Sequence, residues 1–274
     1  MTSPTEISVA RLARLIGTPE APAIIDICID EDFAADPRLV PGSQRRDFRK
    51  VDSWASDYLN RSVVVVCHKG KKLSQGVVAY LRHEGIASES LEGGVVAWRE
   101  QGQELVKIDK LPPRDAKGRT VWVTRQRPKV DRIACPWLIK RFVDPSAVFL
   151  FVAPSEVTAV GERFNAVPFD IDDVFWSHRG ETCTFDTMLT EFGLTSPALQ
   201  HLARIVRGAD TARLDLAPEA AGLLAASLGY SRMYKDDIAQ LDAAMMMYDA
   251  YYRWCRDASD ESHNWPTTGK KTSI

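Results

Sequence analysis

The sequence has no apolar run that approaches the roughly 20 residues a membrane-spanning helix needs. Its first residues, MTSPTEISVARLARLIG, lack a basic region followed by a long apolar stretch, so we expect no signal peptide and no membrane partner. The five cysteines are widely spaced and form no C-x-x-C pair, which argues against a disulfide framework and against a zinc ribbon. These absences predict a soluble, cytoplasmic protein with reduced thiols.

The chain also lacks a dominant charge, because its formal net charge is only −2. No global polycation points to nucleic acid, and binding to nucleic acid is not expected. Its 274 residues are enough for two domains, each with a core of its own. Residues 108–119 combine prolines, a glycine and alternating charges without apolar periodicity, which is typical of a linker. We therefore expect domains at 1–107 and 120–257, followed by a polar tail at 258–274.

What is present begins with Cys67, which closes an apolar run of four valines and opens the segment CHKGKKLSQG. A buried strand should end there, and a helix should follow at 75–84. The loop between them would direct backbone N–H groups and positive charge toward the sulfur, which favours a thiolate and attracts anions. The alternative is a small buried core residue. The predicted anion-binding residues of this loop are His68, Lys69, Gly70, Lys71 and Lys72.

The pattern Cys-x-x-Gly-x-Lys followed by Ser74 resembles the active-site loop of rhodanese-type sulfurtransferases. Three further segments resemble that family in the same order: Ile24-Ile25-Asp26, Leu39-Val40-Pro41-Gly42, and the stretch from Leu91 through Trp98. The resemblance implies an α/β rhodanese-like parallel sheet domain in which Cys67 is catalytic and carries a persulfide. Apolar patterns agree, with strands near 24–28, 63–67 and 87–91 between helices near 6–16, 53–60, 75–84 and 95–101.

Two departures from that family stand out. The loop is more basic than in commoner members, which suits a dianionic or larger oxyanion donor. Cys28 stands where many members have an arginine that supports the active site. If Cys28 lies near the loop, it can resolve an oxidised or persulfidated Cys67 as a disulfide; the alternative is a buried strand cysteine.

A second basic cluster lies where a strand at 120–124 should turn into an amphipathic helix at 131–142. Asp131 is the expected cap of this helix. Guanidinium and ammonium groups beside a helix N-terminus form a plausible oxyanion site, and the alternative is a solvated, charged turn. The cluster consists of Arg125, Arg127, Lys129 and Arg132.

The segment WVTRQRPKVDRIACPWLIKRF resembles the signature of the chromate-resistance family of the ChrB type, and the resemblance continues over about 120–257. It implies a role in chromate or other oxyanion stress, in which Cys135 would be a second catalytic residue that reduces or senses the oxyanion. Helical periodicity at 155–164, 184–192, 197–207, 217–228 and 236–257, beside a strand at 148–152, predicts a mainly helical α+β domain.

Candidate metal ligands cluster in the same region, because His178, Glu181, Cys183 and Asp186 fall within nine positions. Histidine with carboxylates is the ligand set of divalent zinc, manganese or iron. We take His178, Asp186 and Asp210 as the leading set, with Asp131 or Cys135 as a further ligand; the alternative is an ordinary loop histidine. A methionine-tyrosine stripe at 245–252 is typical of core or of a homodimer surface.

These features favour a sulfurtransferase-type enzyme that forms a Cys67 persulfide, coupled to an oxyanion- or metal-binding domain. Sulfur transfer itself requires no cofactor, only a sulfane-sulfur donor and a thiol acceptor; the second domain would take an oxyanion such as chromate. Two alternatives remain open at this point. One is a chromate-responsive regulator, disfavoured by helices of mixed charge. The other is a metal-dependent redox enzyme with a scaffolding first domain.

Overall fold

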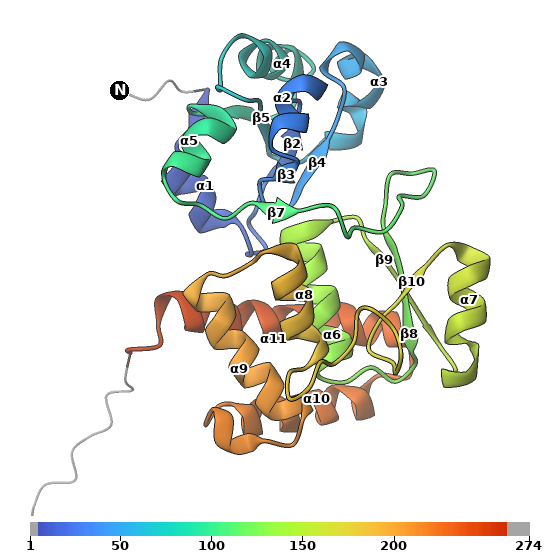
Figure 1. The fold of residues 1–274 in the computed structure, drawn as a ribbon. Helices are drawn as coiled ribbons and strands as arrows, with labels where there is room; N and C mark the ends of the chain where they lie inside the picture. Colours follow the sequence, from blue (N-terminus) through green and yellow to red (C-terminus); the bar gives the residue numbers. More distant parts are fainter. Residues whose placement is uncertain (1–4, 262–274) are drawn as a thin grey trace, which may run out of the picture.

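Five short strands form a parallel sheet in the first domain of the computed structural model, which describes residues 5–261. The strand order is β1-β6-β5-β2-β4, and the predicted parallel α/β sheet is confirmed; β5, β2 and β4 are labelled in Figure 1. In the central pair, Ala23 lies opposite Val63 and Asp26 opposite Val66. The bounds are Glu6–Ile7 (β1), Ala23–Asp26 (β2), Ser43–Arg45 (β4), Val63–Val66 (β5) and Ser88–Leu91 (β6).

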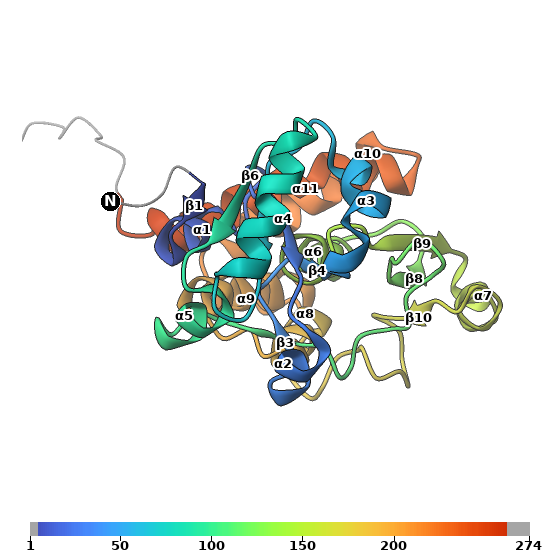
Figure 2. The same ribbon diagram turned by 90° about the horizontal axis from the view of Figure 1, so that it is seen from above.

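The four valines of β5 are buried on both faces of this sheet, as expected for a central parallel strand. Val64 and Val66 pack on the side of α1 (Val9–Leu15) and α5 (Gly94–Glu100). Val63, Val65 and Cys67 pack on the opposite side, beneath α3 (Val51–Trp54) and α4 (Lys72–His83). Figure 2 looks down on α4 from above. Alternation along one strand therefore assigns Cys67 to the α3 and α4 side.

Several small elements of this domain were not predicted. They are α2 (Asp30–Ala35), β4, and an antiparallel pair of β3 (Arg38–Leu39) with β7 (Val106–Lys107). The helix expected at 6–16 begins only at Val9, because Glu6–Ile7 pairs with β6 as an edge strand. The helix expected at 53–60 is the short α3 followed by a 3-10 turn, Ala55–Tyr58.

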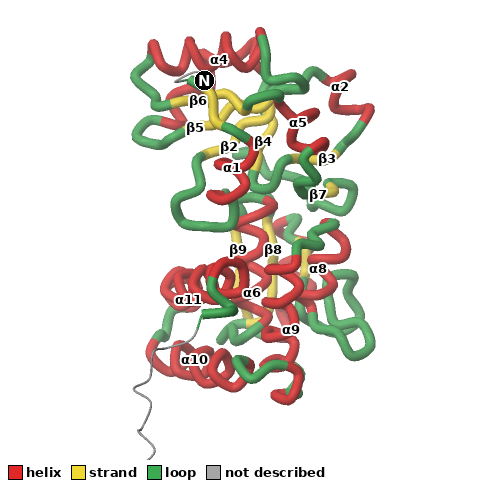
Figure 3. Tube along the Cα trace, turned by 90° about the vertical axis from the view of Figure 1, so that its left-hand side faces the viewer, coloured by secondary structure: helices red, strands yellow, loops and turns green. Residues whose placement is uncertain are grey.

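The second domain is mainly helical, as predicted (Figure 3), and its helices surround a three-stranded parallel sheet of order β10-β8-β9. The helix expected at 131–142 divides into α6 and a π-helical turn, Ile139–Val143. The strands are Val121–Arg125 (β8), Val148–Val152 (β9) and Val167–Pro168 (β10). The helices are Asp131–Leu138 (α6), Val157–Phe164 (α7), Thr184–Phe192 (α8), Pro197–Asp210 (α9), Ala220–Met233 (α10) and Asp237–Asp257 (α11).

Residues 108–119 contain no helix or named strand, and they are bonded to the second domain. Arg114 lies 3.2 Å from the buried carboxylate of Asp144, and an isolated bridge joins Arg114 to Thr120. Of the predicted tail, residues 262–274 lie outside the described part of the chain. No helix within residues 5–261 is long and apolar enough to cross a membrane.

The two domains share one apolar core, which runs from Ile7 and Trp98 in the first to Trp137 and Tyr252 in the second. Met245 and Tyr248 of the methionine-tyrosine stripe belong to this core, while Met246 is exposed. Polar contacts also cross the seam between the domains. The Gly42 N–H donates to Phe142 O at 2.6 Å, and Gln44 Nε2 donates to Ser146 Oγ at 2.8 Å.

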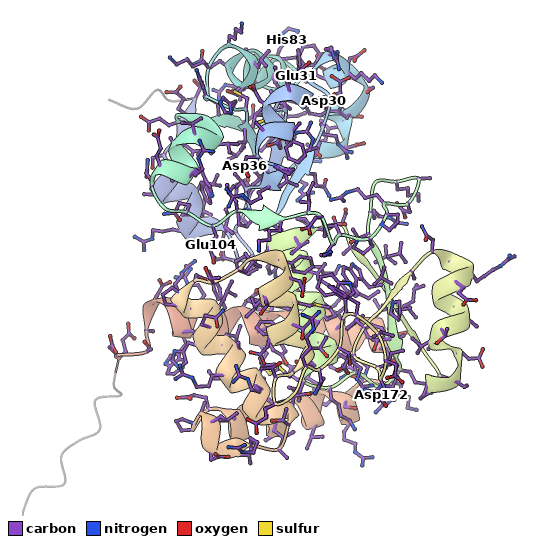
Figure 4. The ribbon with its side chains drawn as sticks, viewed as in Figure 1. Asp30, Glu31, Asp36, His83, Glu104 and Asp172 are labelled. Carbon is purple, nitrogen blue, oxygen red and sulfur yellow. The ribbon has the colours of Figure 1, made fainter. Side chains whose placement is uncertain are left out.

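Glu104 closes the same seam on another side (Figure 4), since its carboxylate accepts the Ser196 N–H at 2.6 Å. With a shared core and direct hydrogen bonds, residues 108–119 do not act as a flexible tether. The two domains are packed as one unit.

Gly17 provides a test of this packing. Its φ is +79°, and a Cβ there would lie 2.5 Å from Phe142 Cζ and 2.7 Å from Tyr252 Cε1. Gly85 has nearly the same φ, +78°, with open space around it. We expect Gly85→Ala to lower the free energy of unfolding by about 1 kcal/mol through backbone strain alone. Gly17→Ala should cost about 1 to 3 kcal/mol more, because it also overpacks the seam.

Urea denaturation of the full chain, followed by far-UV circular dichroism, measures both variants. Equal losses for Gly17→Ala and Gly85→Ala would contradict the tight seam.

Candidate metal centre and candidate thiol site

Three carboxylates and one imidazole from separate parts of the second domain converge on one point. Asp131 is the first residue of α6, and Asp210 is the last residue of α9. Asp170 and His178 come from the loop between β10 and α8, where Asp170 has a φ of 53°. One donor atom from each of these four residues lies within 4.8 Å of the other three. The name carboxylate cluster is used below for Asp131, Asp170, His178 and Asp210.

His178 Nε2 is the centre of the carboxylate cluster. It lies 3.1 Å from Asp210 Oδ2, 3.4 Å from Asp170 Oδ1 and 3.7 Å from Asp131 Oδ2. Two ligands of an ion with bonds of about 2.1 Å lie at most about 4.2 Å apart. Only a small contraction of the four donors is therefore needed to place them all around one ion.

Asp131 is a member of the cluster whose ionised form is strongly destabilised by its surroundings. Its side chain is fully buried, and burial, followed by the charges of Asp210 and Asp170, raises the pKa of its carboxyl well above the usual range. Its Oδ1 atom has no hydrogen-bond partner among the described residues. A buried carboxylate oxygen without a partner is expensive unless a cation or proton satisfies it.

Asp131 does not cap its own helix, so that prediction is wrong. Val130 occupies the N-cap position of α6, and the Asp131 carboxylate turns to a different helix. Its Oδ2 accepts the Thr184 N–H at 2.6 Å and the Phe185 N–H at 3.3 Å, both in the first turn of α8. The start of α8 thus supplies donors that hold a negative charge at this position.

Asp170 is the best-compensated carboxylate of the cluster. Burial opposes its ionisation, but hydrogen bonds from His178 and Thr184, with the charges of Arg132 and Arg125, lower its pKa below the usual value. Arg125 lies 3.2 Å and Arg132 lies 3.3 Å from Asp170 Oδ2.

His178 is held as a cation when no metal is bound. Hydrogen bonds to Asp170 and then Asp210 raise its pKa to about 10. Its side chain is 40% exposed, whereas those of Asp131 and Asp170 are buried. The cluster is therefore closed by protein on the side of the aspartates and open to solvent on the side of the imidazole.

The predicted basic cluster does not form one anion site. Arg125 and Arg132 are engaged with Asp170, and the Arg127 guanidinium donates to the backbone carbonyls of Ser231 and Tyr234 at the end of α10. Lys129 is exposed beside Arg127. Arg127 has a positive φ of 58°, and its guanidinium bonds to the end of α10 rather than to Asp170. Helix periodicity could not reveal that conformation.

The thiol of Cys67 lies at the start of α4 in the first domain. It is 5% exposed and donates a hydrogen bond to Ser74 Oγ at 3.3 Å, while that hydroxyl donates to Lys71 O at 3.1 Å. Ser74 belongs to the first turn of α4, whose backbone N–H groups have no acceptor within the helix. The sulfur is therefore next to a helix N-terminus, as the spacing predicted.

The loop around Cys67 depends on two glycines. Gly70 has a φ of +62°, and a Cβ there would lie 2.4 Å from Leu91 O. At Gly94, which begins α5, a Cβ would lie 2.1 Å from Cys67 O. Lys69, Lys71 and Lys72 are exposed and His68 is partly buried, so the positive charge surrounds the loop from outside.

Cys28 follows β2, the neighbour of β5. Its thiol is close enough to Cys67 for the two groups to interact electrostatically. Burial, then the Asp26 carboxylate, raises the pKa of the Cys28 thiol. An arginine from a neighbouring strand, Arg45 of β4, lies beside this position. Its guanidinium lies 3.1 Å from Asp26 Oδ1 and donates to Cys28 O at 3.2 Å.

The amino ends of three strands in the first domain's sheet face the second domain, whereas Cys67 lies at the carboxyl end. Ala23, Gly42 and Arg61, at the amino ends of β2, β4 and β5, line a cavity together with Lys140 of the second domain. Cys67 follows the carboxyl end of β5, and a four-residue strand is about 13 Å long. Cys67 is therefore separated from the second-domain residues of this cavity by about the length of a strand.

The carboxylate cluster falls within a region that matches a known family. Residues 122–255 match the family model described as ChrB, C-terminal domain. The second domain is a ChrB C-terminal domain. Protein ChrB of Cupriavidus metallidurans is 34% identical over 146 residues, which cover 53% of this chain. The chain spans only 43% of the length of that relative.

The first domain is similar to solved rhodanese-like structures, as its motifs predicted. A rhodanese-like domain protein from Staphylococcus aureus is 25% identical, with a TM-score of 0.33, over 38% of this chain and 99% of its own. A rhodanese-related protein from Thermoplasma volcanium is 20% identical, with a TM-score of 0.33, over 37% of this chain and 96% of its own. A likeness at this level bears on neither activity nor substrate.

Within the ChrB C-terminal domain, two predicted site residues have other roles. Asp186 is not in the carboxylate cluster, because its carboxylate pairs with Arg207 at 2.7 Å and accepts the Cys183 N–H at 3.0 Å. Cys135 is completely buried in α6, and burial raises the pKa of its thiol well above normal. A thiol in that position does not suit a redox or sensing role.

Asp170 is the member of the cluster that the sequence analysis missed as a ligand. It lies two residues after the end of β10, and Arg125 ends the neighbouring parallel strand β8. Carboxyl ends of parallel strands meet at one edge of a sheet, so the pair could have been anticipated had β10, only two residues long, been recognised.

The role of Asp186 leads to a prediction about stability. Asp186→Asn removes the ion pair with Arg207 and weakens the capping box that begins α8. We expect the free energy of unfolding to fall by about 2 kcal/mol. Asp215→Asn, at a fully exposed pair with Arg213, is the matched control and should leave stability unchanged. Urea denaturation measures both; an unchanged midpoint for Asp186→Asn would refute the structural role.

Proposed function

We propose that the ChrB C-terminal domain binds a divalent metal ion in the carboxylate cluster, and that this centre takes an oxyanion such as chromate. The observation that carries the proposal is the convergence of four donors within 4.8 Å around a fully buried carboxylate that lacks a partner at Oδ1. Three carboxylates with one histidine form an oxygen-rich ligand set. That set favours Mn²⁺ or Fe²⁺ over Zn²⁺, whose structural sites use cysteine and histidine.

The balance of charges around the cluster also supports a bound divalent ion. Three ionised carboxylates carry three negative charges, which a divalent ion and the guanidinium groups of Arg125 and Arg132 can balance. The exposed side of His178 leaves room for a further ligand on the ion. Arg125 is 40% exposed beside that opening and is the group that can meet an incoming oxyanion.

Asp131→Asn separates a metal site from a merely structural cluster. The variant keeps the shape of the side chain and removes a buried charge that Asp170 and Asp210 repel. In EDTA-treated protein we expect its melting temperature to equal or exceed that of the unmodified chain. Affinity for Mn²⁺ should nevertheless fall by about a hundredfold or more, because a direct ligand is lost. Calorimetric titration with Mn²⁺ and thermal melts measure the two effects.

Asp172→Asn is the matched control, since Asp172 is an exposed carboxylate in the same loop (Figure 4). It should bind Mn²⁺ like the unmodified protein. Mn²⁺ affinity that is unaffected by Asp131→Asn, or equally reduced by Asp172→Asn, would contradict the metal centre.

A second candidate function belongs to the first domain, and the position of Cys67 beside the first turn of α4 favours it. In this proposal the Cys67 thiolate attacks the outer sulfur of thiosulfate. The S–S bond of thiosulfate breaks, and sulfite leaves with the bonding electron pair. A thiolate or cyanide then attacks the outer sulfur of the Cys67 persulfide and regenerates the Cys67 thiolate.

The amides at the start of α4 and the lysines of the loop support this reaction, because both stabilise an anion that approaches or leaves the sulfur. Arg45, bonded to Asp26 and Cys28 O, adds a positive charge near the carboxyl end of the neighbouring strand β2. A small thiol in solution can act as the acceptor. No group of the second domain is then needed for this step.

Cys67→Ser is the test of sulfur transfer. We expect turnover of thiosulfate with cyanide to fall by about a thousandfold or more, because the nucleophile is lost. Cys255→Ser changes a cysteine on α11 of the second domain and should retain full activity. Thiocyanate production measures both. Retained activity in Cys67→Ser would refute sulfur transfer and leave the metal proposal untouched, since the two sites are independent.

A further inference from the structure

A cavity of about 400 Å³ lies in the seam between the two domains, apart from both sites described above. The first domain contributes the amino ends of its strands, with Ala23, Gly42 and Arg61. The second contributes the π-helical turn, with Lys140 and Arg141, and α11 with Asp242. A cavity of this size at a domain boundary is typical of a small-molecule site.

The charges that line this cavity are unequal. Arg61 and Lys140 have no ion-pair partner among residues 5–261, and each comes from a different domain. Lys140 is half-buried with its ammonium 6.0 Å from the Phe149 ring, while Arg61 is exposed at the rim. The third cation, Arg141, is neutralised by Asp249 at 2.7 Å. Even with the exposed carboxylate of Asp242, the unpaired lining charge is positive.

One polar group of the lining also lacks a partner. Tyr58 is 4% exposed, and its hydroxyl has no hydrogen-bond partner in the described part of the chain. A buried hydroxyl in that state loses about 1 to 3 kcal/mol relative to one that is bonded. An acceptor oxygen on a bound molecule would satisfy it.

The backbone around Lys140 has a helical conformation that is rare in proteins. Residues Ile139–Val143 form a π-helical turn, a conformation that is often found at functional sites. This turn carries Lys140 into the cavity wall, and its Phe142 carbonyl accepts the Gly42 N–H across the seam. A ligand at Lys140 therefore contacts the π-helical turn, which is hydrogen-bonded to Gly42 of the first domain.

We propose that this seam cavity binds a small molecule with two anionic groups, one engaged by Lys140 in the wall and the other by Arg61 at the rim. The Tyr58 hydroxyl donates to the inner anionic group. The ligand is separate from the oxyanion of the carboxylate cluster and from the sulfur donor of Cys67, because neither site shares a residue with this cavity.

Pyrophosphate is the probe, with inorganic phosphate as the single-group comparison. We expect calorimetric titration of the full chain to give saturable 1:1 binding that is tighter for pyrophosphate than for phosphate. Lys140→Met keeps the aliphatic packing and should weaken pyrophosphate binding about tenfold, and Arg61→Gln should do the same, because each removes a charge-assisted contact. Hydrogen exchange in residues 139–143 should slow when pyrophosphate is bound.

Two control variants show whether the anion binds elsewhere. Arg204→Gln changes an exposed cation on α9, and Arg163→Gln changes an exposed cation on α7. Both should bind pyrophosphate like the unmodified chain. The proposal is overturned if binding is absent, if Lys140→Met and Arg61→Gln bind normally, or if either control is weakened as much as they are.

Discussion

The second domain is organised around the cost of placing three carboxylates beside one another. Asp131, Asp170 and Asp210 come from the start of α6, the loop after β10 and the end of α9, so the cluster fixes how these elements meet. Like charges at such short range are unfavourable unless a cation joins them. His178, Arg125 and Arg132 supply part of that compensation, and the first turn of α8 supplies two N–H donors.

The arrangement of the domains keeps Cys67 apart from the seam between the domains. The sheet of the first domain presents its amino ends to the seam and its carboxyl end, with Cys67, to the opposite side. A continuous apolar core and the bond from Gly42 to Phe142 hold this orientation. If the two sites influence each other, the coupling must pass through the seam and the π-helical turn rather than through contact between Cys67 and the carboxylate cluster.

Much of the fold follows from patterns that are local in sequence. Four consecutive valines predict a central parallel strand, and the periodicity of 184–192 predicts α8 with its observed bounds. Elements of two or three residues, such as β4 and β10, carry too little pattern to be predicted. The shared core of the two domains was missed as well, because a proline-rich segment indicates a linker whether or not its flanking domains are packed together.

The residues of the carboxylate cluster also differ in how far the sequence predicts them. His178 and Asp210 could be predicted from residue type, and Asp131 was an alternative ligand, but Asp170 needed the pairing of β8 with β10. Asp186 was misassigned, although its place three residues after Cys183 at a helix start is the spacing of a capping box.

The central claim is that the four donors hold an ion. Anomalous diffraction from crystals grown with Mn²⁺ tests it most directly. We expect one strong anomalous peak bonded to Asp131, Asp170, His178 and Asp210; well-ordered crystals without a peak there, and with His178 still paired to the aspartates, would contradict a metal centre.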